Sequence, residues 1–155
     1  STKKDRTPQE KRFGVQIDSL SDLICFGVLP GVTVYAAARG ALYAALAAGL
    51  YVLAALIRLA WFNVDEEERQ DADNGQREMY LGLPVTTAAL FLPTVLGLAR
   101  LLHGPLPILG TALLVVMALA FLSPFKLAKP RLPGMILMIL MGCAELVIVF
   151  LGVKL

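Results

Sequence analysis

The chain has 155 residues, of which 57% are hydrophobic and 17% are charged, and its net charge is +2. Soluble domains carry about 45–50% apolar and about 25% charged residues, so this composition excludes an ordinary soluble domain. The charged residues are also clustered in the sequence, which is typical of an integral membrane protein.

Residues 1–12 are polar and basic, and they predict a segment at the cytoplasmic surface. A membrane-spanning helix needs about 20 apolar residues. The rest of the chain, 13–155, predicts one transmembrane domain with five spans and no soluble domain. We expect an all-α polytopic membrane helix bundle, with a polar cytoplasmic loop over 63–81 and spans over 13–38, 40–62, 84–102, 107–121 and 133–153.

The positions of the basic residues predict the topology. If residues 1–12 lie inside and the chain crosses five times, most of the fourteen lysines and arginines lie on the inner side. Cytoplasmic loops carry this excess of lysine and arginine. We therefore expect a multi-pass protein of the cell membrane, with Asp18, Asp22, Arg58 and Asn63 at one cytoplasmic level.

Two carboxylates four residues apart, Asp18 and Asp22, stand at the beginning of the first apolar stretch. On a helix they would lie on one face, one turn apart, with Gly14 a further turn back. Neighbouring carboxylates repel each other and resist burial, so a bound cation would stabilise them. Mg²⁺ or Mn²⁺ suits ligation by oxygen atoms alone.

The pattern Gly14-x-x-x-Asp18-x-x-x-Asp22 resembles the second half of the CDP-alcohol phosphotransferase signature, D-x-x-D-G-x-x-A-R followed by G-x-x-x-D-x-x-x-D. R-L-A-W-F-N from Arg58 and G-L-P from Gly82 resemble segments of the phosphatidylserine synthase branch, with a tryptophan where that branch more often has arginine. The first half of the signature is absent before Gly14. We therefore expect a fragment, inactive alone, whose missing N-terminal part supplies that half.

The resemblance implies that an alcohol hydroxyl attacks the lipid-side phosphorus of CDP-diacylglycerol and that CMP leaves. It implies two divalent cations, Mg²⁺ or Mn²⁺, held by four carboxylates, of which this chain carries two. By the family pattern Asp18 is a metal ligand, Asp22 is both a metal ligand and the catalytic base, and Gly14, Arg58 and Asn63 contact the substrate. L-serine is the favoured acceptor. The other expected partners are membrane lipids and a second copy of the chain, and no nucleic acid is expected.

Three alternatives remain open at this point, and the weakest is a structural membrane subunit in which Asp18 and Asp22 are only a polar helix start. The same chemistry could use another acceptor, such as glycerol phosphate or inositol phosphate. A non-enzymatic membrane transporter subunit could instead bind a transported cation at Asp18 and Asp22. Such a site should lie near the middle of the bilayer, whereas this pair is predicted at the cytoplasmic entrance, which favours the enzyme. Arg58 admits two interpretations, a phosphate clamp or a side chain that extends to the membrane surface.

Overall fold

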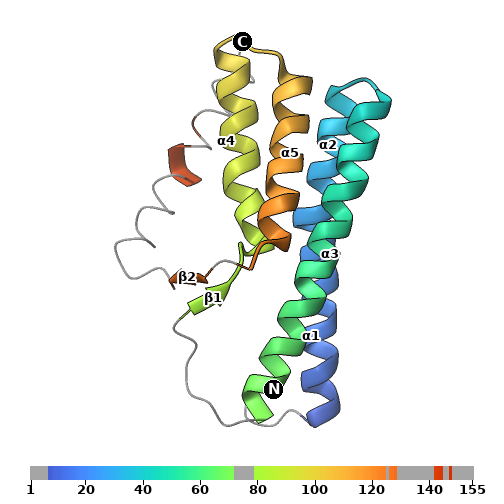
Figure 1. The fold of residues 1–155 in the computed structure, drawn as a ribbon, viewed down its shortest axis with the longest axis vertical. Helices are drawn as coiled ribbons and strands as arrows, with labels where there is room; N and C mark the ends of the chain where they lie inside the picture. Colours follow the sequence, from blue (N-terminus) through green and yellow to red (C-terminus); the bar gives the residue numbers. More distant parts are fainter. Residues whose placement is uncertain (1–6, 72–78, 125, 129–141, 145–146, 148–155) are drawn as a thin grey trace.

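The structure is a computed structural model that describes residues 7–71, 79–124, 126–128, 142–144 and 147. Within these ranges the chain is a helix bundle with one small sheet (Figure 1). The elements, in chain order, are α1 Pro8–Asp22, η2 Leu23–Val28, α2 Leu29–Ala37, α3 Leu42–Asp71, β1 Met79–Leu81, η3 Val85–Thr87, α4 Ala88–Leu101, α5 Leu106–Leu122 and β2 Lys126–Ala128.

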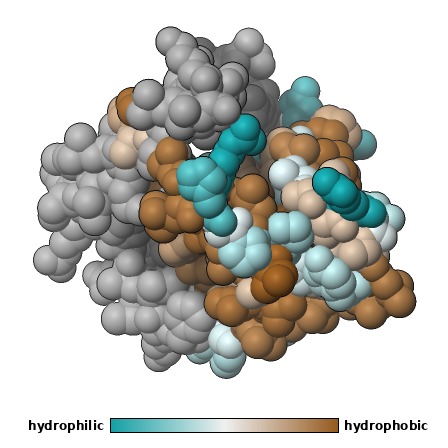
Figure 2. All heavy atoms as spheres, turned by 90° about the horizontal axis from the view of Figure 1, so that it is seen from above, coloured by the Kyte–Doolittle hydropathy of each residue, from teal (hydrophilic) through white to brown (hydrophobic). Residues whose placement is uncertain are grey.

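The predicted membrane helix bundle is confirmed. Among the described residues, two helical stretches are long and apolar enough to cross a membrane, Pro8–Ala37 and Leu42–Glu68. Two shorter apolar helices, Val85–Leu101 and Leu106–Leu122, accompany them. Figure 2, which views the end of the bundle opposite the N-terminus, shows mostly apolar side chains on the coloured surface. The fifth predicted span, 133–153, lies almost wholly outside the described residues, so the five-span topology stays a prediction.

The first helix begins at Pro8, five residues earlier than the predicted span, and this difference has a local cause. Thr7 and Glu10 form a capping box in which the Glu10 N–H donates to Thr7 Oγ1 at 3.2 Å and the Thr7 N–H donates to Glu10 Oε2 at 2.7 Å. A proline in the first turn also favours a helix start, because an N–H at that position would have no hydrogen-bond acceptor within the helix. The end of the basic segment is therefore helical.

The helix changes register between Asp22 and Leu29. The irregularity lies just before Pro30, in the π-helical segment η2, where the Leu29 N–H donates to the Ile24 carbonyl. Pro30 has no N–H, so it cannot bond the Phe26 carbonyl four residues earlier. The Tyr51 hydroxyl of α3 donates to that carbonyl at 2.5 Å instead.

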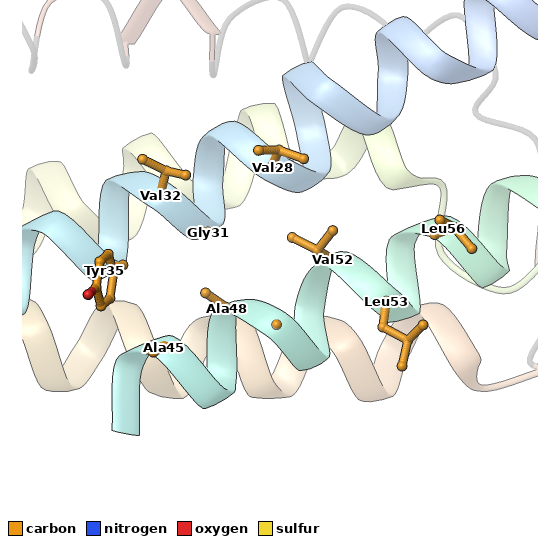
Figure 3. Close-up of a pocket in the computed structure, with 10 residues that line it drawn as sticks. Val28, Gly31, Val32, Tyr35, Ala45, Ala48, Val52, Leu53 and Leu56 are labelled. Atoms are coloured by element: carbon orange, nitrogen blue, oxygen red, sulfur yellow. The ribbon is translucent and has the colours of Figure 1, made fainter. Parts of the chain in front are cut away.

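Helix α3 is the longest helix described and packs against η2, α2 and α5 (Figure 1). Small residues let α2 approach it closely, since a Cβ added at Gly31 would lie 3.3 Å from Ala48 Cβ. Tyr51 is fully buried in the core, and its ring lies 5.6 Å from that of Phe121 on α5. On its outer side the α2–α3 pair carries a shallow apolar groove, lined by residues that include Val28, Val32, Tyr35, Ala45, Val52 and Leu56 (Figure 3).

The predicted polar loop over 63–81 is shorter than expected, because α3 continues through Asn63 to Asp71. Glutamate, arginine and glutamine are good helix formers, so a helix that leaves the apolar layer can continue in the charged segment. β1 then pairs antiparallel with β2 in the register Met79↔Ala128, Tyr80↔Leu127 and Leu81↔Lys126. This sheet, absent from the prediction, joins the chain before α4 to the chain after α5.

Candidate metal and substrate site

Asp18 and Asp22 lie in the second half of α1, so the predicted helical spacing is confirmed. Side chains four residues apart on a helix have Cβ atoms about 5–6 Å apart and share one face. Asp18 is exposed and Asp22 is half-buried. A Cβ added at Gly14, one turn before Asp18, would meet no atom within 4 Å. The carboxylates and the glycine therefore form an open face that a ligand can approach.

This open face fits a hard divalent cation. Carboxylate oxygens are the ligands that Mg²⁺ and Mn²⁺ prefer, and the two aspartates project together from one helix face. Across the part of the chain that the structure describes, no three histidine, cysteine, aspartate or glutamate side chains come together. The described residues thus supply a pair of carboxylates on α1, and the predicted role of Asp18 and Asp22 as metal ligands stays a prediction. Glu145 of the last apolar segment lies outside the described residues.

Asn63 lies next to α1, at Ser19, the residue that follows Asp18. The Asn63 Nδ2 group donates to Ser19 Oγ at 2.8 Å, and Ser19 Oγ lies 3.2 Å from Asn63 Oδ1, to which it donates in turn. Both side chains are half-buried. The structure therefore brings Asn63 beside the segment that carries the carboxylates, and its amide bonds α1. The cytoplasmic position of this level stays a prediction. Its predicted substrate contact stays a prediction.

Arg58 is buried, with 7% of its surface exposed, so it does not extend to the membrane surface. Its Nε donates to the Leu83 carbonyl at 3.1 Å and its Nη2 donates to the Gly82 carbonyl at 3.3 Å. The G-L-P segment is thus a turn held by the guanidinium. Gly82 has a φ of +73°, and a Cβ there would lie 2.9 Å from the Ser123 carbonyl oxygen after α5. These contacts give Arg58 a structural role, and its predicted phosphate contact stays a prediction.

The turn held by Arg58 is connected to the carboxylates through packing. It leads directly into η3, whose Thr87 hydroxyl donates to the Pro84 carbonyl at 2.6 Å. The η3 segment packs against η2, and η2 begins at the residue after Asp22. Helix α3 therefore contacts the carboxylate segment directly through Asn63, and Arg58 connects α3 to it indirectly through the G-L-P turn, η3 and η2.

Sequence reasoning missed Ser19 and Tyr51, and it named Gly82 only as part of the G-L-P segment, without its role in the turn. The missing N–H of Pro30 predicts an unpaired carbonyl at Phe26, and this signal could have led to a search for a donor such as Tyr51. No comparable signal identifies the partner of Ser19. A glycine before Leu-Pro is compatible with a turn, but only the packing shows that a Cβ is excluded.

Known proteins similar to this chain come from several branches of life. A CDP-diacylglycerol–serine O-phosphatidyltransferase from Saccharomyces cerevisiae is 36% identical over 88 residues, 56% of this chain and 31% of the yeast protein. An archaetidylserine synthase from Methanothermobacter thermautotrophicus is 33% identical over 124 residues, 79% of this chain and 47% of that protein. A CDP-diacylglycerol–serine O-phosphatidyltransferase from Methanocaldococcus jannaschii is 28% identical over 117 residues, 76% of this chain and 50% of that protein.

The chain thus spans between about a third and a half of the length of these relatives. No protein-family model matches it. The matched names agree on serine and differ in the lipid.

Proposed function

Because the chain belongs to the CDP-alcohol phosphotransferase family, in its phosphatidylserine synthase-like branch, we propose that it serves in the transfer of a phosphatidyl group from CDP-diacylglycerol to L-serine. The products are phosphatidylserine and CMP. Serine is the proposed acceptor because each of the relatives compared above carries it in its name. The observation that carries the proposal is the open face that Gly14, Asp18 and Asp22 form on α1, directly before the apolar segments η2 and α2.

Asp18 and Asp22 would hold the divalent cations, which when bound neutralise the diphosphate of the donor lipid and stabilise the charge that develops on the leaving group. Asp22 has a second role in the proposal. One of its carboxylate oxygens accepts the proton of the serine hydroxyl as the serine oxygen forms a bond to the lipid-side phosphorus. The bond from this phosphorus to the bridging oxygen breaks, CMP keeps the electron pair, and Asp22 later releases the proton to water.

The remaining residues shape the site. Gly14 has no side chain, and the space beside it is open, so the nucleotide can approach the α1 backbone. Arg58 and Asn63 enter the proposal as the residues that hold α3 against the G-L-P turn and against α1. The basic residues Lys11 and Arg12, exposed in the first turns of α1, support a cytoplasmic position for this face in a multi-pass membrane protein.

The test uses the natural gene product that contains these residues, reconstituted with CDP-diacylglycerol in liposomes. CMP release is followed with serine, glycerol phosphate or inositol phosphate, in Mn²⁺, Mg²⁺ or excess EDTA. We expect release that requires serine and a divalent ion and falls at least about 100-fold in Asp22→Asn, the scale of loss for a general base. The control variant Glu67→Gln removes an exposed carboxylate on a different helix, α3, and should retain full activity.

Other outcomes separate the alternatives. Release with a different alcohol would retain the chemistry and replace serine as the acceptor. The absence of CMP release with every acceptor, together with cation flux into the same liposomes, would refute the enzyme and support a cation transporter.

A further inference from the structure

Helix α1 carries the carboxylates, yet it is weakly attached to the bundle. It buries no residue, whereas α2 and α3 both contribute to the core. It has few close backbone contacts with α3, which packs instead against α5, α2 and η2. The reciprocal hydrogen bonds between Ser19 and Asn63 join α1 directly to α3, across 44 residues of sequence.

The position of Ser19 on the helix makes this attachment relevant to the site. Successive residues of an α-helix are turned by about 100°, so Ser19 points about 60–100° away from both Asp18 and Asp22. The serine can therefore bond α3 while both carboxylates remain on the open face. A rotation of α1 by about 20° would move side-chain tips, about 5–6 Å from the axis, by about 2 Å. Productive sites need their groups within about 0.5 Å of the correct position.

The covalent connection of α1 to α2 does not fix the rotation of α1 about its axis by α-helical periodicity alone. Asp22 is followed by η2, whose hydrogen bonds run from residue i to residue i−5 instead of i−4. The π segment changes the rotational relation between α1 and α2. A second attachment on the far side of that segment, at Ser19, therefore defines the direction in which the carboxylates project.

We propose that Ser19 and Asn63 are positioning residues that set the rotation of α1 and so hold Asp18 and Asp22 in the geometry that binds the divalent cation. The inference rests on the proposed function in one respect, since it assigns the cation to these two carboxylates. It gives Asn63 a role through α1 in place of direct contact with substrate.

The test combines metal binding with kinetics in the natural gene product. The variants are Ser19→Ala, Asn63→Ala, the double alanine variant, and the exchange Ser19→Asn with Asn63→Ser, which retains both side chains in reversed positions. Ser21→Ala is the matched control, because Ser21 is exposed on α1 and its hydroxyl bonds only its own helix, at the Ile17 carbonyl. Mn²⁺ affinity is measured by electron paramagnetic resonance, which needs no turnover.

We expect each single alanine variant to bind Mn²⁺ about 3-fold to about 18-fold more weakly, the range that interhelical hydrogen bonds in membranes give. The value of kcat should fall while KM for serine is unchanged. The double variant should be no worse than either single one, the exchange should recover most of the affinity, and Ser21→Ala should match the unmodified protein.

A raised KM for serine or lipid in Asn63→Ala, with unchanged Mn²⁺ affinity, would overturn the inference and make Asn63 a substrate ligand. Unchanged values in both alanine variants would overturn it as well. If the unmodified protein releases no CMP with any alcohol, the proposed function fails, yet the Mn²⁺ measurements still decide the inference. If it binds no Mn²⁺, there is no cation geometry to position and the inference fails with it.

Discussion

Removing the hydroxyl of Tyr51 isolates the bond that compensates for Pro30. In Tyr51→Phe the ring and its packing against Phe121 remain, and only the donor to the Phe26 carbonyl is lost. Because Pro30 has no N–H, no α-helical bond from that position can replace the donor. Tyr51 is fully buried, so water cannot readily take its place. The Phe26 carbonyl should therefore lose its partner.

Two scales bound the expected loss of stability. A buried polar group that loses its partner costs about 1–3 kcal/mol in soluble proteins. Interhelical hydrogen bonds within membranes average about 0.6 kcal/mol and reach about 1.7 kcal/mol. The short bond and complete burial of Tyr51 favour the upper part of the membrane range. We expect Tyr51→Phe to lower the free energy of unfolding by about 1–1.7 kcal/mol.

The assay is reversible unfolding in mixed detergent micelles, followed by far-ultraviolet circular dichroism. Tyr43→Phe removes a hydroxyl from an exposed tyrosine of the same helix and should change stability by less than about 0.5 kcal/mol. The decisive measurement repeats Tyr51→Phe in a Pro30→Ala background. There the new N–H of residue 30 can bond the Phe26 carbonyl, so the loss should shrink to less than about 0.5 kcal/mol. An equal loss in both backgrounds would refute the link between Tyr51 and Pro30.

Three further predictions concern the rest of the described structure. Gly82→Ala should lower the free energy of unfolding by about 2–3 kcal/mol, because the φ of +73° disfavours a side chain and the added Cβ would lie 2.9 Å from the Ser123 carbonyl oxygen. The control is Gly49→Ala, where an added Cβ meets no atom within 4 Å, and it should be neutral or stabilising in the same unfolding assay. Arg58→Lys should cost about 1.5–3 kcal/mol of stability, since one ammonium cannot reproduce the forked contact with two carbonyls; an unchanged midpoint would show that the turn does not depend on it. Thr7→Ala should expose the amides at the start of α1 to faster hydrogen exchange, with a loss of about 1 kcal/mol, and equal exchange rates would contradict the capping box.

Much of the helical architecture follows from the sequence alone. Long apolar stretches predict helices of membrane dimensions because a helix satisfies its own backbone hydrogen bonds in an apolar layer. The spacing of Gly14, Asp18 and Asp22 predicts one face because the helical period is a local property of the backbone. The earlier start of α1 also has a local cause, because the capping box is formed by Thr7 and Glu10, which are three residues apart in the sequence.

The tertiary structure decided which polar groups meet. Tyr51 and Phe26 are 25 residues apart, Arg58 and Gly82 are 24 apart, and Ser19 and Asn63 are 44 apart. Helical periodicity does not relate such distant pairs, because each contact depends on the position and rotation of one element relative to another. The sequence by itself therefore determined that two carboxylates share a face of α1. Only the packing of α3 against η2 and its hydrogen bonds to α1 determined where that face is directed.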